Sequence, residues 1–328
     1  MGSFYLSNSG SFFSLVQNDI QSVETRMQSQ ADGYHSDLRA ALELLLSAGG
    51  KRIRPTITLL IGQMLDAPIE RLITLASAIE LLHTATLVHD DLIDGSLLRR
   101  GMPTLNSQWS PGATVLTGDF LFSCAAKLAA ETESIPVIKL FAQTLTVIVN
   151  GEVTQLLSGR NCITRDMYRQ RIYAKTASLI ETAARSAALI APVNEASVEK
   201  MRIFGYEIGM GFQIVDDILD FTGEEATLGK PVGSDLRQGL VTLPTIIYNE
   251  LHPENPDIQA LIEGNHSLSD EQVDQFVDVI RQSKAIDLSL QEAHQFIDRG
   301  LKSLIDLPEK KEKRALEDLA KFIIERKI

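Results

Sequence analysis

Apolar side chains recur at helical spacing along most of the chain, and this pattern decides which elements we expect. Runs of alternating apolar and polar residues, which would indicate strands, are almost absent. A Gly-Gly pair at 49–50 ends one apolar run, and a proline at 55 opens the next. The predicted helices cover residues 18–27, 35–47, 55–65, 69–94, 111–132, 135–157, 165–190 (divided near 175–176), 195–221, 243–251, 270–283, 286–305 and 310–326.

The segments between these helices have turn chemistry but do not resemble flexible linkers. The main ones are residues 95–111, 223–239 and 252–269. No unit repeats along the chain with a solenoid period. The sequence therefore predicts an all-α protein with one domain over residues 1–328, built on a bundle of long antiparallel helices, with residues 1–14 disordered.

Composition narrows the class of protein. The 328 residues are 44% hydrophobic and 23% charged, which is typical of a globular chain. A net charge of −12 disfavours a nucleic-acid partner. Cys124 and Cys162 lie in no metal-ligand spacing, so a reducing cytoplasm is expected. No basic residue precedes the N-terminal apolar stretch, and Glu80 and His83 interrupt the most apolar window. We therefore expect neither a secretory signal nor a membrane span.

Two aspartate-rich motifs, at 90–94 and 216–220, carry the strongest chemical signal. Both read D-D-x-x-D after a long apolar run, which places them on core-facing helices. Asp90 and Asp94 share a helix face, as do Asp216 and Asp220, and such like charges destabilise a helix unless a cation lies between them. Carboxylate oxygens favour Mg²⁺ over zinc. One motif alone would fit a solvated helix face equally well, but two matched copies favour metal binding.

Basic residues accompany both acidic motifs, although the chain as a whole is acidic. The loop G-G-K-R-I-R-P at 49–55 places three cations at the start of a helix, which itself attracts anions. Arg99 and Arg100 follow the first motif, and Lys230 follows the second. Mg²⁺ on carboxylates with Lys and Arg on the free oxygens is a typical arrangement for holding polyphosphates. Neither a P-loop nor a dinucleotide fingerprint occurs.

The order of these and other motifs resembles the trans-isoprenyl diphosphate synthases, or polyprenyl synthetases. The resemblance covers roughly residues 15–328. It rests on G-G-K-R-I-R-P at 49–55, L-L-H-T-A-T-L-V-H-D-D-L-I-D at 81–94, R-R-G at 99–101, G-D-F-L at 118–121, G-E-x-x-Q at 151–155, K-T at 175–176, G-x-x-F-Q-I-x-D-D-I-L-D at 209–220 and G-K-P-x-G-x-D-L at 229–236. It implies the isoprenoid synthase fold, in which helices surround a central cavity.

The resemblance also implies a reaction, a head-to-tail condensation of two diphosphates. An allylic diphosphate ionises, the double bond of isopentenyl diphosphate attacks the carbocation, and a proton is lost. Asp90, Asp94 and Asp216 would bind roughly two or three Mg²⁺ ions, with Asp220 as a weaker ligand. Residues expected to hold the allylic diphosphate are Arg99, Lys175 and Lys230. Those expected to hold isopentenyl diphosphate are Lys51, Arg54, His83 and Arg100. Thr176 and Gln213 would face the reacting carbon.

Two positions bear on the details of this resemblance. Leu240 stands where the family often has a lysine that assists diphosphate binding, which removes one expected cation. The resemblance implies that the product grows into an apolar tunnel beside the first motif helix, where Ala85 and Thr86 are small and would leave it open. The predicted product is therefore a geranylgeranyl or longer polyprenyl diphosphate. Candidates for the facing wall are Thr144, Val147 and Ile148, with Phe141 as a candidate floor, although ordinary core packing would explain them as well.

Other functions remain open at this point. A non-catalytic regulatory subunit of a heteromeric prenyl synthase would share the fold, but such a subunit usually has one degraded Asp motif. A terpene cyclase would not need the loop at 49–55. The resemblance further implies a homodimer, for which the apolar helix at 111–130 is a candidate interface.

Overall fold

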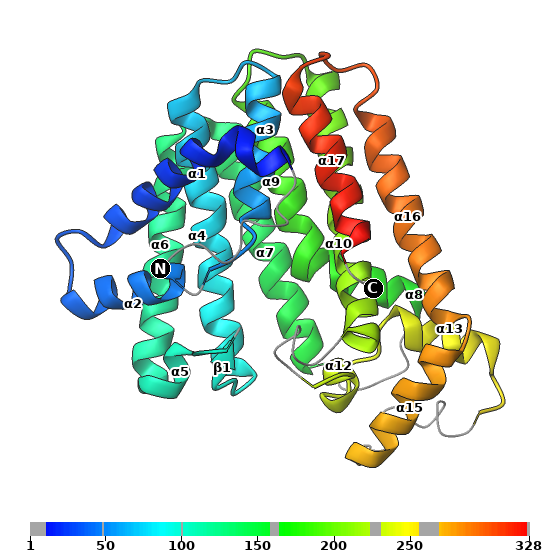
Figure 1. The fold of residues 1–328 in the computed structure, drawn as a ribbon. Helices are drawn as coiled ribbons and strands as arrows, with labels where there is room; N and C mark the ends of the chain where they lie inside the picture. Colours follow the sequence, from blue (N-terminus) through cyan, green and yellow to red (C-terminus); the bar gives the residue numbers. More distant parts are fainter. Residues whose placement is uncertain are drawn as a thin grey trace. The chain divides into compact units, whose positions relative to one another are not determined.

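The described chain is almost entirely helical, which confirms the all-α prediction. The computed structural model describes residues 11–47, 49–99, 101–157, 164–223, 231–255 and 269–326. The α-helices are α1 (Ser11–Gln28), α2 (Ser36–Ser47), α3 (Ile53–Met64), α4 (Ile69–Ile93), α5 (Leu105–Gln108), α6 (Pro111–Glu131), α7 (Ile135–Leu157), α8 (Arg165–Ile172), α9 (Ser178–Leu189), α10 (Glu195–Thr222), α12 (Ser234–Arg237), α13 (Leu243–Leu251), α15 (Asp270–Gln282), α16 (Ala285–Ser303) and α17 (Lys311–Glu325) (Figure 1). The remaining elements are a 3-10 turn η1 (Ser29–Ala31), a π-helical segment η2 (Tyr173–Ala177) and a hairpin of β1 (Leu98–Arg99) and β2 (Met102–Pro103).

The chain divides into two compact units, each assembled from separated segments. Unit 1 comprises Met1–Thr144, Leu179–Arg202 and Leu304–Leu319. Unit 2 comprises Leu145–Ser178, Ile203–Ser303 and Ala320–Ile328. No single cut in the sequence separates them, and the expectation of one domain over residues 1–328 stays a prediction.

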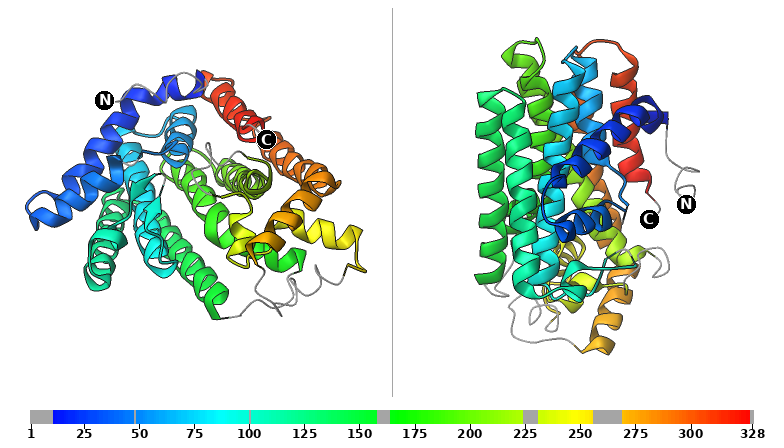
Figure 2. Two further views of the ribbon diagram at one scale, coloured as in Figure 1. Left: turned by 60° about the horizontal axis from the view of Figure 1, so that its bottom comes forward. Right: turned by 90° about the vertical axis from the view of Figure 1, so that its left-hand side faces the viewer.

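Unit 1 is built around α4, which is apolar on nearly all sides and is therefore buried. Leu75, Ile79 and Leu82 of this helix are fully buried. Helices α1 and α3 pack on it, and α6 runs alongside it (Figure 2). The approach of α6 to α4 is close because Gly118 has no side chain: a Cβ there would lie 2.1 Å from Nε2 of His89.

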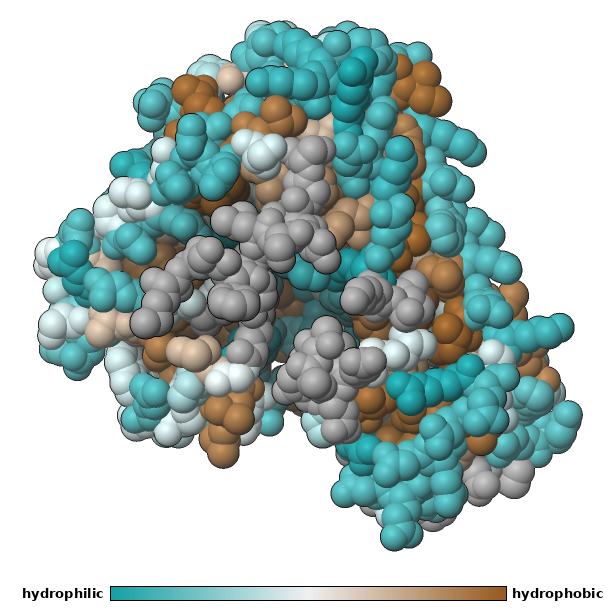
Figure 3. Space-filling model, viewed as in Figure 1, coloured by the Kyte–Doolittle hydropathy of each residue, from teal (hydrophilic) through white to brown (hydrophobic). Residues whose placement is uncertain are grey.

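Unit 2 has its own core, in which the second half of α10 packs with α8, α13, α15 and α16. Ile214, Ile218 and Phe221 supply the buried face of α10. Helix α15 is amphipathic: its residues Val273 and Val277 are buried, and the surface over it is mostly hydrophilic (Figure 3). The second acidic motif therefore lies on a helix that is fixed by packing on several sides.

The predicted helix ends agree with the structure where the apolar pattern is long. Helices α7 and α13 have the predicted bounds, and η2 interrupts the run 165–190 at the predicted division. At the N-terminus the prediction of disorder over 1–14 is wrong for residues 11–14. Helix α1 already begins at Ser11, because Phe12 and Val16 are buried and hold its first turns. Residues 1–10 lie outside the described ranges.

Short elements were not predicted. Helix α5 and the β1–β2 hairpin lie inside the segment 95–111, and α12 lies inside 223–239. Helix α5 has four residues and depends on a cap, since Thr104 Oγ1 accepts from the N–H of Ser107 at 3.3 Å. A single turn has no periodicity to detect, so such elements follow from capping chemistry rather than from the apolar pattern.

Helices α4 and α6 are long and apolar enough to cross a membrane by length and composition alone. Core helices pass the same test, and 67% and 44% of their apolar windows are buried inside the protein. The expectation of no membrane span stays a prediction.

The contact at Gly118 gives a stability prediction. Gly118→Ala pushes a methyl group into the His89 ring, whose Nε2 lies 3.2 Å from the carbonyl oxygen of Val115. We expect the free energy of unfolding to fall by about 1–3 kcal/mol in urea denaturation.

The matched control is Gly112→Ala on the same helix, where a Cβ meets nothing within 4 Å. This change should leave stability unchanged or raise it by up to about 1 kcal/mol. An equal loss in both variants would contradict the role given to the His89 contact.

Candidate active site

Both acidic motifs lie at the C-terminal ends of long helices. Asp90 is in the last turn of α4 and Asp94 is its C-cap, whereas the motif at 216–220 lies in the last two turns of α10. The C-terminal end of a helix carries partial negative charge, so a carboxylate in the last turn is unfavourable by about 0.3–1 kcal/mol. Each motif thus adds negative charge where its helix already has some, and a bound cation would relieve it.

In the first motif the second aspartate is buried and bound to an arginine. Asp91 is 5% exposed. Arg99 of β1 donates from Nε to its two carboxylate oxygens at 2.9 and 3.1 Å, and Nη2 lies 2.8 Å from Oδ1. Asp94 is exposed and Asp90 is half-buried. The two expected metal ligands are therefore the accessible members of this motif.

The second motif repeats this division of roles. Asp217 is 4% exposed and accepts from the Tyr168 hydroxyl at 2.7 Å and from Gln213 Nε2 at 2.9 Å. Asp220 is 2% exposed, and its Oδ2 accepts from the backbone N–H of Asp235 at 3.0 Å. Asp216 alone among the three has a substantially exposed side chain, at 38%. The burial of Asp220 fits the weaker role expected for it, which stays a prediction.

Burial changes the proton affinity of one member of this second motif, Asp217. The pKa of Asp217 is raised to about 7, because the carboxylate is desolvated and lies near the charge of Asp235. The hydrogen bonds from Gln213 and Tyr168 act in the opposite direction. Desolvation and the nearby Asp217 charge also raise the pKa of the Tyr168 hydroxyl well above its usual value, which keeps it protonated as a donor.

Thr176 and Gln213, expected at the reacting carbon, lie together in unit 2. Thr176 Oγ1 donates to Gln213 Oε1 at 2.6 Å, while the amide nitrogen of Gln213 donates to Asp217. Thr176 and Lys175 belong to the π-helical segment η2, and such segments occur often at functional sites. Lys175 is exposed, whereas Thr176 is 6% exposed.

Two of the residues expected to bind isopentenyl diphosphate lie at the start of α3 in unit 1, and a third lies on α4. Lys51 is exposed in the loop before the helix, Arg54 lies in the first turn, and His83 is half-buried on α4, which packs against α3. Arg100 and Lys230 lie outside the described residues. The binding roles of all these residues stay predictions.

Comparison with known proteins identifies the family. A family model described as polyprenyl synthetase matches residues 35–280. The chain belongs to the polyprenyl synthetase family. Heptaprenyl diphosphate synthase component 2 of Geobacillus stearothermophilus is 37% identical over 321 residues, which cover 95% of this chain and 97% of that protein. All-trans-nonaprenyl-diphosphate synthase (geranyl-diphosphate specific) of Rhodobacter capsulatus is 38% identical over 287 residues, or 86% and 87% of the two chains.

Solved structures agree with this assignment. Polyprenyl synthase from Caulobacter crescentus, complexed with calcium and isoprenyl diphosphate, has a TM-score of 0.90 to this chain at 34% identity, with 97% of each chain covered. This polyprenyl synthetase therefore has the all-α isoprenoid synthase fold, and it is a chain-elongating trans-prenyltransferase.

One residue of this polyprenyl synthetase site was missed by the sequence analysis. Arg326, just after α17, donates from Nη1 to Asp216 Oδ1 at 2.8 Å and lies 4.1 Å from the centroid of the Phe212 ring. Its side chain is 7% exposed. The second motif thus has its own arginine counter-ion, as the first has Arg99. No local spacing rule connects positions so far apart in sequence.

The donor set fits a hard divalent cation that is shared with a substrate. Within the described ranges, no group of three or more His, Cys, Asp or Glu side chains is arranged to hold a metal by itself. Mg²⁺ typically uses one or two carboxylates together with substrate phosphates and water. Each unit offers accessible carboxylates of this kind, Asp90 and Asp94 in unit 1 and Asp216 in unit 2.

Two further features limit what the site contains. Leu240 is half-buried beyond α12, its backbone N–H donates to the Asp235 carbonyl oxygen, and its apolar side chain supplies no cation. Arg171 of α8 donates from Nη2 to the neighbouring carbonyl oxygen of Val241.

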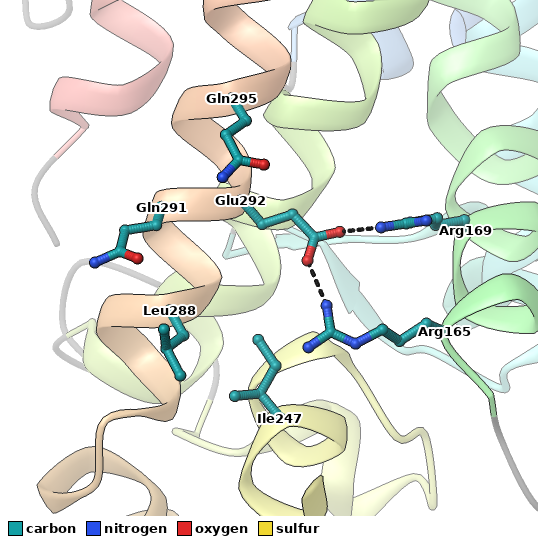
Figure 4. Close-up of a pocket in the computed structure, with 7 residues that line it drawn as sticks. All are labelled: Arg165, Arg169, Ile247, Leu288, Gln291, Glu292 and Gln295. Carbon is teal, nitrogen blue, oxygen red and sulfur yellow. Dashed lines mark hydrogen bonds and ion pairs between the residues drawn. The ribbon is translucent and has the colours of Figure 1, made fainter. Parts of the chain in front are cut away.

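A pocket of about 320 Å³ in unit 2 contains none of the expected site residues (Figure 4). Arg165 and Arg169 extend into it, but both donate to Glu292, at 2.7 and 2.8 Å, and Arg165 also binds Glu250. The two arginines of this pocket are therefore neutralised by Glu292 and Glu250, in ion pairs that tie α8 to α13 and α16. We assign no catalytic role to this pocket.

Proposed function

We propose that this protein catalyses the Mg²⁺-dependent condensation of isopentenyl diphosphate with an allylic diphosphate. The observation that carries this proposal is the pair of acidic motifs at helix C-termini, each with its first aspartate accessible. The expected metal ligands Asp90, Asp94 and Asp216 are at least partly exposed, although Asp216 Oδ1 also accepts from Arg326, while the second aspartates are buried. The residue types agree, since a departing diphosphate needs its charge neutralised, which bound Mg²⁺ would supply.

The protein's own groups account for the remaining steps. Arg99, Lys175 and Lys230 would hold the allylic diphosphate, and Arg100 would join Lys51, Arg54 and His83 in holding isopentenyl diphosphate, as the sequence predicts. The Gln213 carbonyl and the Thr176 hydroxyl present dipoles that would stabilise an allylic cation without bonding to it. No protein nucleophile is required, because the attacking group is the double bond of isopentenyl diphosphate.

A long product is the second part of this proposal. Ala85 is fully buried on α4 and Thr86 is half-buried, so no large side chain stands at the positions expected to close the tunnel. In the same unit Phe141 is 6% and Thr144 4% exposed, as wall or floor residues would be. Relatives are named as heptaprenyl, octaprenyl and nonaprenyl synthases, which favours a product longer than geranylgeranyl diphosphate.

For the assembly we infer a cytoplasmic homodimer. Helix α6 exposes Val115 and Leu116, at 40% and 67%, and α7 begins with Ile135 at 68%. A second copy covering these side chains would remove apolar surface from water. A heteromeric partner is the alternative, because the Geobacillus relative is named as one component of its synthase. The buried free Cys124 fits a reducing compartment.

The isolated chain should therefore be active by itself. Incubated with Mg²⁺, farnesyl diphosphate and isopentenyl diphosphate, it should give products of geranylgeranyl length or longer in chromatography. Light scattering should give the mass of two chains. Chelation of the metal should abolish turnover. Activity that appears only after a second polypeptide is added would favour the regulatory-subunit alternative, and no product beyond farnesyl would contradict the open tunnel.

Ala85→Phe tests the tunnel directly. Ala85 is the small residue at which the proposed tunnel stays open, so a phenyl ring there should block growth of the chain, and the main product should become shorter by several isoprene units. Product length is measured by chromatography at fixed substrate ratio. The variant should still turn over short allylic substrates, which is the control for folding. If it does so and the product length is unchanged, the tunnel floor lies elsewhere.

Asp216→Asn and Asp220→Asn form a matched pair for the metal. The accessible Asp216 should be a ligand, so its amide variant should raise the half-saturating Mg²⁺ concentration by about 10–100-fold. Asp220→Asn keeps an oxygen for the Asp235 N–H and should change that concentration much less. Unfolding midpoints of both variants control for stability. A larger metal effect in Asp220→Asn would reverse the assignment.

A further inference from the structure

Arg52 lies between Lys51 and Arg54 but differs from both in its surroundings. It is the N-cap of α3 and has φ 44° and ψ 36°, the left-handed region that non-glycine residues rarely occupy. Its side chain is 12% exposed, whereas Lys51 is exposed. A strained backbone that persists at such a position must be held by its surroundings.

The guanidinium group of Arg52 joins three helices to the loop. Nε donates to Glu24 Oε1 of α1 at 2.9 Å, and Nη1 donates to Glu80 Oε1 of α4 at 3.0 Å. Nη2 donates to the carbonyl oxygen of Leu46 in α2 at 3.2 Å. Burial acts to lower the pKa of Arg52, but the Glu80 and Glu24 carboxylates outweigh it and raise this pKa, so the group stays charged.

These bonds make Arg52 unsuited to binding a diphosphate itself. Two carboxylates face one guanidinium, so the cluster of Arg52, Glu24 and Glu80 carries a net negative charge. The Glu80 side chain is only 7% exposed, which leaves the cluster little room to rearrange. Its effect on an anionic substrate must therefore act through the residues beside it.

Those neighbours are the cations expected to hold isopentenyl diphosphate. Fixing the backbone at Arg52 sets the direction in which the chain leaves Lys51 and enters the helix turn of Arg54. Glu80 lies three residues before His83 on α4, so the two share a helix face. One guanidinium thus connects the Lys51–Arg54 segment to the part of α4 that carries His83.

We propose that Arg52 is a positioning residue that holds Lys51 and Arg54 in register with His83 and so preforms the isopentenyl diphosphate site. The inference rests on the proposed function, because that function supplies the ligand. The two substrates are expected to use different cations. Loss of Arg52 should therefore weaken the binding of isopentenyl diphosphate and leave the binding of the allylic diphosphate largely unchanged.

Arg52→Met is the first variant. We expect the KM and the calorimetric Kd for isopentenyl diphosphate to rise by about tenfold or more, with the allylic KM changed by less than about twofold. Arg52→Lys keeps the charge but lacks the fork that reaches three acceptors, so its shift should be intermediate. Glu80→Gln removes the charge of one acceptor and keeps the shape of its side chain, so it should also raise the KM and Kd for isopentenyl diphosphate. This variant replaces Arg52→Met in the test if Arg52→Met does not fold.

The matched control is Arg71→Met in the same unit. Arg71 also ties helices together, since its Nε and Nη2 donate to the Thr132 carbonyl at 2.8 and 2.6 Å, but it lies away from the loop at 49–55. This variant should lower the unfolding midpoint without changing the ratio of the two KM values. Parallel changes in both KM values in the Arg52 and Arg71 variants would reduce Arg52 to a general stabilising contact and overturn the proposal.

Arg52→Gly separates the backbone from the side chain. Glycine adopts φ 44° without strain but has no guanidinium, so we expect it to behave like Arg52→Met. Isopentenyl diphosphate binding as tight as in the unmodified protein would show that backbone conformation alone matters, and would overturn the proposal. If the unmodified protein neither binds isopentenyl diphosphate nor forms product, the proposed function itself fails. That outcome differs from a failure of the Arg52 proposal, which is judged by comparing the variants with an active unmodified protein.

Discussion

Both acidic motifs are governed by negative charge at a helix C-terminus, that of α4 in unit 1 and that of α10 in unit 2. A helix end of that polarity disfavours carboxylates, and each motif adds three of them within two turns. The protein handles this charge residue by residue. Within each motif the second aspartate is withdrawn into the core and bonded, so that repulsion is reduced and the first aspartate remains on the accessible face. The accessible residues are then the ones a cation can reach.

The buried aspartates also organise their surroundings. Asp217 accepts the amide N–H of Gln213, and the amide oxygen of that residue must then point toward the Thr176 hydroxyl. Tyr168 closes the other side of the carboxylate from within the core. A line of hydrogen bonds therefore runs from a fully buried tyrosine to the π-helical segment. The buried Asp217 is therefore the group that fixes the orientation of the Gln213 amide.

The long helices and the accessible aspartates could be predicted because both follow local rules. Periodicity over many turns identifies α7, and i,i+4 spacing identifies the paired carboxylates. The partners of the buried groups could not be predicted in this way. Arg326 is 110 positions from Asp216, and Arg52 is 28 positions from both Glu24 and Glu80. Such contacts depend on tertiary packing, and the left-handed conformation of Arg52 follows from them rather than from its residue type.

The same charge arrangement bears on whether the protein is a catalyst or a silent partner. A non-catalytic subunit gains nothing from like charges at i,i+4 on a helix end, which are unfavourable by about 0.2–0.5 kcal/mol per pair. Burying Asp91 and Asp217 adds desolvation, which explains why each has a strong donor: Arg99 for one and Tyr168 for the other. Structural stability alone would favour neutral side chains at all these positions. The presence of these charged aspartates, with donors that bind the buried ones, is explained if the accessible carboxylates bind a cation. This favours a catalytic protein over a non-catalytic subunit.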